Sequence, residues 1–547
     1  MARQKTFGLT QGGAWKRLFV IAIVIVLAIA GLAFVTARTE APSQARPIVA
    51  ADGTSAEYGA AAFVGAGFGG ISQDALETNA IPWKLTAAAL VLAEVRSDPT
   101  APVDHDTLRK VMQRFGFLYP DEVAGFGPQF PSQLAEKPLG MTHGTIAPIG
   151  GARVEVANLG CAACHSGVAY DASGNPQTEK AYPGTPNTSL DLEGYTQAIF
   201  VALRDHIDDP ALVETAQKLF PDMGWRERIS LRWIVLPLAR DRLAQLEGEA
   251  RALPFSNGLP GSTNGVAALK LQLATPLMGA GSDDRGFVSI PELALRNRRS
   301  RLLVDGVYAV PSGDADQQQL AAITSFFTVP SMGVHPASAR RQIGDAQAIF
   351  AWLADYRAPR FPGTINQARA RSGLTIFNAQ CAQCHGDYEW GEGDQPSLVT
   401  FPDWVGDVGS DGLRAAAFDE ALARAVEQTN YSDVIALERG DGYAAPPLAG
   451  LWYSAPYLHN GSVQSLSALL DPSLRLERFM VGGHALDLEA LGIRLLPDGR
   501  YPEGYVPFSR PQWIETSEPG LGNQGHAFGS ELSDDERAAL IEFLKTL

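Results

Sequence analysis

The distribution of apolar residues separates the start of the chain from the rest. An unbroken apolar run extends from Leu18 to Val35, and four basic residues precede it: Arg3, Lys5, Lys16 and Arg17. These eighteen residues are close to the shortest helix that spans a bilayer, and a basic flank stays on the cytoplasmic side. Val35-Thr36-Ala37 resembles a small-residue cleavage site. We therefore expect residues 1–36 to be a signal anchor or a removable signal peptide, followed by a linker over 37–60.

Later stretches have the spacing of amphipathic helices. Two apolar faces are formed by Ala370, Gly373, Leu374 and Phe377, and by Leu540, Phe543, Leu544 and Leu547. Capping boxes precede them, at Thr364 with Gln367 and at Ser533 with Glu536. Because such a pair can pack face to face, we expect these helices to contact each other, with Gly373 allowing a close approach of the two backbones.

The first half of the chain is less regular. Residues 193–203, 210–219 and 230–252 are predicted to be helices, with a kink at Pro237. Residues 258–286 are rich in Gly, Ser, Asn and Asp and are predicted to be loop. The pattern as a whole predicts a mainly α fold.

The chemistry is carried by two pentapeptides, Cys161-Ala162-Ala163-Cys164-His165 and Cys381-Ala382-Gln383-Cys384-His385. The spacing suits covalent attachment of c-type haem, in which two thiols bond to the porphyrin vinyl groups and the adjacent histidine binds the iron. All four cysteines lie in these motifs, so none remains for a disulfide. A single four-cysteine zinc site or two redox dithiols are the alternatives, but neither requires a histidine after each pair. We expect two covalently bound c-type haems.

The two motifs predict two haem domains. His165 and His385 are 220 residues apart, too far for one small cytochrome domain. We place a first haem domain at 61–356 and a second at 364–547, where the predicted helices before Cys381 and at the C-terminus match a cytochrome c arrangement. The first domain is expected to be divergent, with long loops, because Val154 and Val156 alternate instead of forming a helix before Cys161. Apart from the pentapeptides, no internal repeat is evident.

Charge and topology limit the partners. The net charge is −16 and the pI is near 5.1, which argues against nucleic acid as a ligand. An acidic surface fits a redox partner protein such as a small basic electron carrier. We expect the chain on the periplasmic side of the bacterial inner membrane, anchored by its N-terminal helix, or soluble in the periplasm or secreted if the signal is cleaved.

The remaining iron ligand decides what each haem can do. A second strong ligand makes an electron-transfer haem, whereas an open face binds oxygen or peroxide. For the haem at His385 we expect His526, which lies just before the C-terminal helix, with His459 as the rival or as a residue that contacts the haem. No histidine lies between His165 and His206, so the first haem has no evident second ligand.

Several segments resemble a known group of dihaem c-type enzymes. The segments are 447–452, 455–462 (Ala-Pro-Tyr-Leu-His-Asn-Gly-Ser), 114–120 and Gly525-His526. They are most similar to the family around the dihaem rubber oxygenase, with the bacterial dihaem cytochrome c peroxidases as more distant relatives. The resemblance implies a mostly helical two-haem fold. It also implies an active haem at His165 and a bis-histidine haem at His385 with His526.

The resemblance has limits at individual positions. The peroxidases carry a distal histidine shortly after their first haem motif, which this chain lacks. The oxygenase places bulky apolar residues over the open iron, and Phe287, Phe326 and Phe327 are of that type. Trp352, Trp390, Trp404 and Trp452 could lie beside the haems, although packing is the simpler role for each.

Together these features predict an exported dihaem oxidoreductase of the peroxidase or dioxygenase type. His165 is the predicted catalytic residue, and oxygen or peroxide the small oxidant. The alternative is a non-enzymatic, membrane-anchored electron-transfer cytochrome with two closed haems. A redox or gas sensor would need an output domain, and the segment before Leu18 is too short for one.

Overall fold

The computed structural model describes most of the chain after its N-terminal segment. The described ranges are 54–64, 81–127, 137–146, 154–251, 253–273, 285–309, 320–322, 343–391, 395–430, 436–438 and 442–547, with single residues 324, 340, 393 and 440. The predicted anchor or signal, with most of the linker, lies outside them. Among the described helices, none is both long and apolar enough to cross a membrane.

The mainly α prediction is wrong, because the fold is mixed α/β, with 40% helix and 16% strand. The strands form small sheets of two or three strands each within the described ranges. Most strands are only two to six residues long, and such short segments are below the length at which alternation is visible in a sequence. The sequence pattern therefore did not predict these strands.

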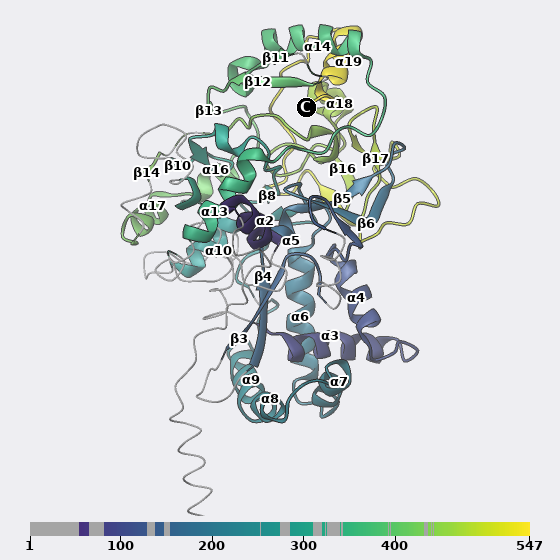
Figure 1. Cartoon of the computed structure of the whole chain (residues 1–547), viewed down its shortest axis with the longest axis vertical. Coiled ribbons are helices and arrows are strands. Elements are labelled where there is room, and N and C mark those ends of the chain that lie inside the picture. The colour runs from purple at the N-terminus through teal and green to yellow at the C-terminus, as the bar shows by residue number, and fades with distance from the viewer. Residues whose placement is uncertain are drawn as a thin grey trace, which may run out of the picture.

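Two helix pairs share one design, and in Figure 1 one lies at the top of the view and the other near its middle. Helix α14 (Gln367–Gln380) packs on α19 (Asp534–Leu544), as predicted, and α2 (Ser55–Val64) packs on α13 (Ile343–Asp355). At each crossing a glycine meets a backbone carbonyl. A Cβ atom on Gly373 would lie 2.0 Å from the Ala539 oxygen, and one on Gly59 would lie 1.9 Å from the Ala348 oxygen. Both helix pairs therefore need a glycine to reach their packing distance.

The first haem motif thus has a helical frame that the sequence did not indicate. Helix α2 starts at Ser55, inside the segment expected to be linker, and is separated from Cys161 by almost a hundred residues. In the second half, α14 leads directly into Cys381. The frame of the first motif was missed because an insertion separates its first helix from the motif.

A short helical turn and a β-hairpin follow the same order at both motifs. After α5 (Cys161–Cys164) come β5 (Ser166–Tyr170) and β6 (Pro176–Pro183), and after α15 (Ala382–His385) come β11 (Asp387–Trp390) and β12 (Pro396–Thr400). Both hairpins are antiparallel. The two halves of the chain therefore repeat a structural unit that extends well beyond the pentapeptides.

The insertion builds a helical layer with a core of its own. It contains α3 (Trp83–Ser97), α4 (His105–Arg114), β3 (Met141–Ile146) and β4 (Val154–Leu159), and it is joined by α6 (Leu192–His206) and α7 (Ala211–Leu219). The predicted helices at 193–203 and 210–219 are confirmed. Buried residues of this layer form one hydrophobic cluster, and the rest of the chain forms a second. The second cluster includes residues on both sides of the predicted domain boundary near 360, which stays a prediction.

The predicted helix at 230–252 runs instead from Trp225 to Gln245. It consists of α8 (Trp225–Ser230), a π-helical turn η3 (Leu231–Val235) and α9 (Leu236–Gln245). The π turn ends two residues before Pro237. Because proline has no amide hydrogen and clashes with the carbonyl of the preceding turn, a wider turn accommodates it. The predicted loop at 258–286 contains another helix, α10 (Gly265–Gln272), which the Gly-rich composition concealed.

The remaining elements are short and surround the cores. They are β1 (Ile81–Pro82), β2 (Glu122–Val123), β7 (Ser262–Thr263), β8 (Val288–Ser289), η4 (Arg296–Arg298), β9 (Arg301–Leu302), β10 (Tyr308–Ala309), β13 (Val405–Gly406), α16 (Leu413–Ala417), α17 (Glu420–Glu427), β14 (Ala436–Leu437), β15 (Tyr443–Ala444), η6 (Leu451–Tyr453), α18 (Leu466–Leu470), η7 (Pro472–Leu474), β16 (Arg478–Val481), β17 (Leu486–Asp487), β18 (Gly492–Ile493) and β19 (Gln512–Glu515).

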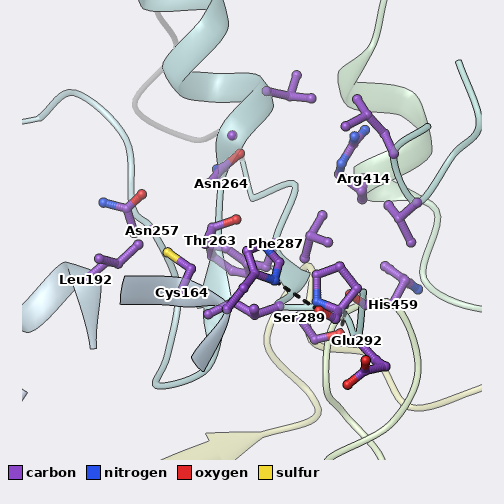
Figure 2. Close-up of a pocket in the computed structure, with 18 of the residues that line it drawn as sticks. Cys164, Leu192, Asn257, Thr263, Asn264, Phe287, Ser289, Glu292, Arg414 and His459 are labelled. Carbon is purple, nitrogen blue, oxygen red and sulfur yellow. Dashed lines mark hydrogen bonds between the residues drawn. The ribbon is translucent and has the colours of Figure 1, made fainter. Parts of the chain in front are cut away.

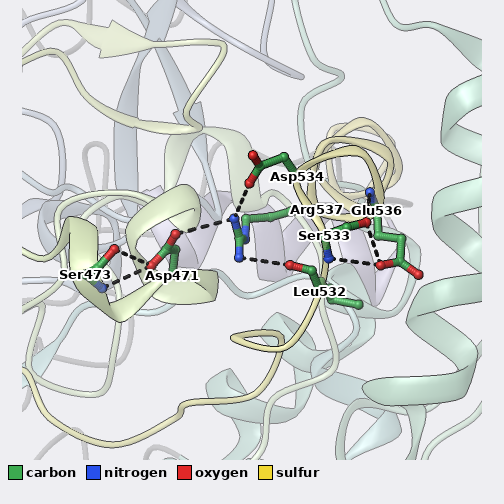
Figure 3. Close-up of polar contacts among 7 residues, drawn as sticks. All are labelled: Asp471, Ser473, Leu532, Ser533, Asp534, Glu536 and Arg537. Atoms are coloured by element: carbon green, nitrogen blue, oxygen red, sulfur yellow. Dashed lines mark hydrogen bonds and ion pairs between the residues drawn. The ribbon is translucent and has the colours of Figure 1, made fainter.

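Polar contacts fix the start of α19 (Figure 3). The predicted capping box is confirmed: the Ser533 hydroxyl accepts from the Glu536 amide, and the Glu536 carboxylate accepts from the Ser533 amide at 2.9 Å. Arg537, one residue further on, forms an ion pair with Asp471 at 3.3 Å. At α14 the predicted cap is wrong, because Asn366 accepts from the Arg369 amide and replaces Thr364 in that role.

A buried histidine joins the two halves. His484 has no exposed surface, and its Nε2 lies 3.5 Å from the Thr188 hydroxyl. Its backbone carbonyl accepts from the Tyr170 hydroxyl at 3.4 Å. Burial lowers the pKa of His484 to about 4, because a charged imidazole loses its hydration there. His484 is therefore neutral in the folded protein at neutral pH.

We predict opposite effects of two Gly-to-Ala substitutions in helices. Gly373→Ala should destabilise the fold by roughly 1–3 kcal/mol, because its methyl group would collide with the Ala539 carbonyl. Gly344→Ala, in α13, meets no atom within 4 Å and should stabilise by up to about 1 kcal/mol through helix propensity. Denaturant unfolding measures both, and equal effects would contradict the close packing of α14 on α19.

We also predict that His484 makes the fold acid-sensitive. Its folded pKa of about 4 lies below the unfolded value of about 6.5. The stability it contributes is therefore complete above the unfolded pKa and is lost as the pH falls from about 6.5 towards 4. His484→Gln should flatten the stability curve in this window, as measured by urea unfolding at several pH values. A curve with an unchanged slope would show that His484 is not buried in neutral form.

Candidate functional site

A single large cavity contains both pentapeptides. Its volume is about 1680 Å³, and its lining includes every residue predicted from the sequence to bind haem: Cys161, Cys164, His165, Cys381, Cys384, His385, His459 and His526. Ligand pockets in proteins usually measure roughly 300–1,000 Å³. The cavity is therefore larger than one ordinary ligand site, and most of its wall is apolar.

The cysteines are free at the wall of this cavity, where Cys164 is buried and the other three are half-buried. All four are without disulfides, and burial raises the pKa of the Cys161 and Cys164 thiols to about 12. Among the described side chains, no group of three or more His, Cys, Asp or Glu converges as metal ligands. Because all four cysteines are described, they do not form one shared zinc site. The thiols are available for bonds to another group in the cavity.

His165 is oriented by a proline carbonyl. Its Nδ1 lies 3.1 Å from the Pro291 oxygen, and since a carbonyl only accepts, Nδ1 carries the proton. Burial, then the charge of Arg296, lower the pKa of His165 to about 4. The ring is therefore neutral, and its Nε2 has a free lone pair, which is the state that a metal-binding histidine requires.

His385 repeats this arrangement. Its Nδ1 lies 2.8 Å from the Pro446 oxygen, and burial lowers its pKa. A leucine follows each acceptor proline two residues later, at Leu293 and Leu448. Two carbonyls from distant parts of the chain thus hold the two imidazoles in the same way.

The imidazole ring of His526 lies close to that of His385. The ring centroids are 6.3 Å apart. Half of this separation, about 3 Å, equals a metal–nitrogen bond of about 2 Å plus the distance from nitrogen to the ring centre. Burial, then the charge of His385, lower the pKa of His526 to about 4, so it is also neutral. The two rings therefore fit a single metal ion between them, as a haem with two axial histidines requires.

The loop that presents His526 is held by Arg475. Its guanidinium donates to the carbonyls of Asn523 at 2.6 Å, Gly525 at 2.8 Å and His526 at 3.3 Å. Gly525 has a φ of 80°, and a Cβ there would lie 2.3 Å from the Ser410 nitrogen. His526 itself has a φ of 45°, and its amide donates to the Val408 carbonyl at 2.8 Å. The position of the imidazole thus depends on this clamp.

His459 lies in the cavity wall but does not pair with His385. Its ring stacks on Tyr443 with centroids 4.0 Å apart, and its buried Nε2 has no hydrogen-bond partner among the described residues. Its carbonyl accepts from the Ser289 amide at 2.7 Å (Figure 2). The stacking places His459 against β15, so its position suits a residue that contacts the cavity contents.

The surroundings of His165 differ from those of His385. No described histidine ring lies opposite its own, whereas His143 and His335 have side chains outside the described set. Phe287 lines the cavity near Cys164, Leu192 and Thr263 (Figure 2). Phe326 and Phe327 lie outside the described residues. Of the four tryptophans considered, Trp404 lines the cavity, while Trp352, Trp390 and Trp452 do not.

A buried carboxyl group follows the carbonyl that holds His165. Glu292 accepts a hydrogen bond from the Tyr453 hydroxyl and contacts Tyr356. Burial raises the pKa of Glu292 to about 7, although these hydrogen bonds oppose the shift. A carboxyl group with a pKa near neutrality can take up or release a proton at the cavity wall.

Arginines supply positive charge to the same cavity. Arg296 lines it without an ion-pair partner among the described residues, and burial lowers its pKa to about 9. Arg299 lies 4.0 Å from Asp403, and Arg414 forms a fully buried ion pair with Asp305 at 2.5 Å. Arg296 is half-buried at the cavity wall, with the Glu292 carboxyl near enough to favour its charge, so it suits an anionic group of a ligand, such as a haem propionate.

Sequence reasoning missed Pro291, Pro446, Glu292, Arg296 and Arg475. Two of them act through backbone carbonyls and three through charged side chains, and none belongs to a short motif. The repeated proline with a leucine two residues later was the one available signal. It was weak because the two prolines lie at different distances from their histidines, 126 and 61 residues.

A family comparison matches the part of the chain around Pro446 and His459. Residues 442–480 match a family model described as RoxA-like, cytochrome c-like. This match supports a c-type cytochrome of the RoxA-like kind, with covalently bound haem iron. The matched stretch contains the Tyr-Leu-His-Asn-Gly-Ser segment that carried the resemblance in the sequence, and neither pentapeptide lies within it.

Two curated proteins of Sinorhizobium fredii resemble parts of the chain. Uncharacterized protein y4iJ is 40% identical over 115 residues, which cover 19% of this chain and 18% of that protein. Uncharacterized protein y4iM is 30% identical over 165 residues, which cover 25% of this chain and 36% of that protein. The chain thus spans well under half the length of the curated relatives it matches.

We predict that Arg475 positions His526, the expected second ligand of the haem at His385. In the haem-loaded protein, Arg475→Met should release the loop at 523–526 and convert part of the His385 haem from low spin to high spin. Arg475→Lys should hold the loop in part and so give a smaller high-spin fraction than Arg475→Met, because one ammonium group replaces only some of the guanidinium donors. Arg478→Met, at an exposed ion pair with Glu515, is the control. Electron paramagnetic resonance measures the spin state, and a fully low-spin Arg475→Met variant would contradict the clamp.

Proposed function

We propose that this chain is an exported dihaem c-type oxidoreductase with one electron-transfer haem and one reactive haem. Cys381, Cys384 and His385 would hold the electron-transfer haem, with His526 as its second ligand. Cys161, Cys164 and His165 would hold the reactive haem, which would bind oxygen or peroxide. When bound, the haem irons supply the redox chemistry, and the chain supplies orientation, burial and proton control.

The observation that carries this proposal is the unequal environment of the two proximal histidines. His385 faces His526 at 6.3 Å between ring centroids, which suits a closed iron. At His165 the described side chains offer no such partner, and Phe287 contributes an apolar wall. Because a vacant axial position is needed for a small oxidant, this asymmetry favours a reactive site at His165.

The residues around His165 support oxidant chemistry. The Pro291 carbonyl fixes the imidazole, so its Nε2 stays directed at the iron position. Glu292, with a pKa of about 7, can hold a proton close to this site or release it. Of these features, a closed electron-transfer cytochrome would need only the fixed imidazole, which His385 also has.

The continuous cavity supports electron exchange between the two sites. Residues of both pentapeptides line the same cavity, so among the described residues the two sites are connected through it. We propose that electrons enter or leave through a soluble redox protein, for which a small basic carrier would suit the acidic chain. The organic substrate, if there is one, would be met at the His165 site. We also propose that the chain acts on the periplasmic side of the inner membrane.

We predict that the resting protein has one high-spin and one low-spin haem. His526→Ala should remove the second ligand of the His385 haem and give a second high-spin signal, without loss of covalently bound haem. His206→Ala, at the end of α6 and outside the cavity lining, serves as the control. Absorption and electron paramagnetic spectra of the purified protein provide the measurement.

The same spectra separate the proposal from its alternative. A resting protein with two low-spin haems in both oxidation states would be an electron-transfer cytochrome, and the proposal of a reactive site at His165 would fail. If His526→Ala leaves the spectrum unchanged, the assignment of His526 as a ligand fails instead. The two results are independent because each concerns a different haem.

A further inference from the structure

An exposed aromatic and basic face lies far from the C-terminal helix pair. The helix from Trp225 to Gln245 and α7 lie at one end of the long axis, while α14 and α19 lie at the other (Figure 1). Four large apolar side chains of this helix are exposed: Trp225 by 64%, Ile229 by 44%, Trp233 by 69% and Leu238 by 52%. No other tryptophan in the described part of the chain is exposed to this degree.

Arginines accompany these apolar side chains. Arg226 lies over the Trp225 ring at 5.4 Å, and Arg232 lies over the Trp233 ring at 5.7 Å. Arg226, Arg228 and Arg232 are exposed and have no acidic partner among the described residues. We call Trp225, Arg226, Arg228, Ile229, Arg232 and Trp233 the Trp-Arg face. Its positive charge stands out in a chain with a net charge of −16.

The opposite side of the helix is firmly attached to the protein. Glu227 forms an ion pair with Lys84 at 2.6 Å and accepts from the Glu155 amide at 3.2 Å. Ser230, Leu231 and Val235 are buried. The helix is therefore packed against the protein on one side, and it still exposes the Trp-Arg face on the other. Exposing two indoles to water has a free-energy cost, which a surface that accepts them would remove.

We propose that the Trp-Arg face binds the surface of an anionic lipid bilayer. Indole rings favour the headgroup level of a membrane, and an interfacial helix combines such rings with basic side chains on its polar face. Each arginine near an anionic surface contributes roughly 1 kcal/mol. The face lies on a helix at one end of the described part of the chain (Figure 1), where it can approach a flat surface. This contact is separate from any anchoring by the N-terminal apolar run.

The same helix connects this face with the haem cavity. Arg242, Leu243 and Leu246, at and just after the end of α9, line the cavity that contains the Cys161 motif. Contact of the Trp-Arg face with a bilayer would therefore bring the lipid headgroups close to this part of the cavity wall. The proposal does not depend on the spin state or the reaction of either haem.

Radiolytic hydroxyl-radical footprinting tests the proposal on the full, haem-loaded chain. The chain is reconstituted into vesicles of phosphatidylethanolamine with phosphatidylglycerol, or of phosphatidylcholine alone, so that anchoring is possible in both. We expect oxidation of Trp225 and Trp233 to slow severalfold on the anionic vesicles and to stay unchanged on the phosphatidylcholine vesicles. Phe528, which is 52% exposed elsewhere, should keep its rate. High salt should restore oxidation, because it screens the charges.

Charge reversal provides the matched variants. Arg228→Glu with Arg232→Glu should abolish the protection, whereas Arg357→Glu with Arg360→Glu, the same change of charge on another exposed segment, should leave it intact. All four positions are exposed, so folding should not change, and the haem spectrum checks this.

Three results would overturn the proposal. They are unchanged oxidation on anionic vesicles, equal protection on phosphatidylcholine, and protection that increases with protein concentration without any vesicles. The last result would assign the face to contact between copies of the chain.

Discussion

The site depends on two hydrogen bonds between a histidine ring and a proline carbonyl. His165 bonds to Pro291 and His385 to Pro446, and each bond fixes both the tautomer and the direction of the free Nε2. The acceptor carbonyls lie far along the chain from the motifs, so they reach the imidazoles only when the surrounding segments are folded. The glycine crossings of α2 on α13 and of α14 on α19 bring each helix pair to its close packing distance beside these motifs.

This repeated frame gives the two halves the same scaffold and leaves their differences to the loops. In the second half, Arg475 holds the loop that presents His526 to His385. In the first half, the corresponding part of the cavity is lined by Phe287 and its neighbours, and Glu292 follows the acceptor proline. A common scaffold with different loops is a simple physical route from one repeated unit to two sites with different surroundings.

The insertion after α2 adds a layer with a separate core and a separate outer surface. This layer carries the helix from Trp225 to Gln245, whose inner side is held by Glu227 and Lys84 and whose outer side exposes the Trp-Arg face. The same helix ends at the cavity wall. The layer therefore connects an exposed surface with the site at the first motif, which the common frame alone would not do.

The sequence by itself determined the local chemistry. Four cysteines and two histidines at fixed spacing indicate c-type haem whatever the fold, and the apolar face before Cys381 and the capping box at Ser533 were correctly predicted from neighbours a few residues apart. The tertiary structure decided the rest. Short strands lack a visible period, α2 is separated from its motif by an insertion, and Pro291, Glu292 and Arg475 act on groups distant in sequence. Such contacts are selected by packing and burial over the whole chain, and no short pattern records them.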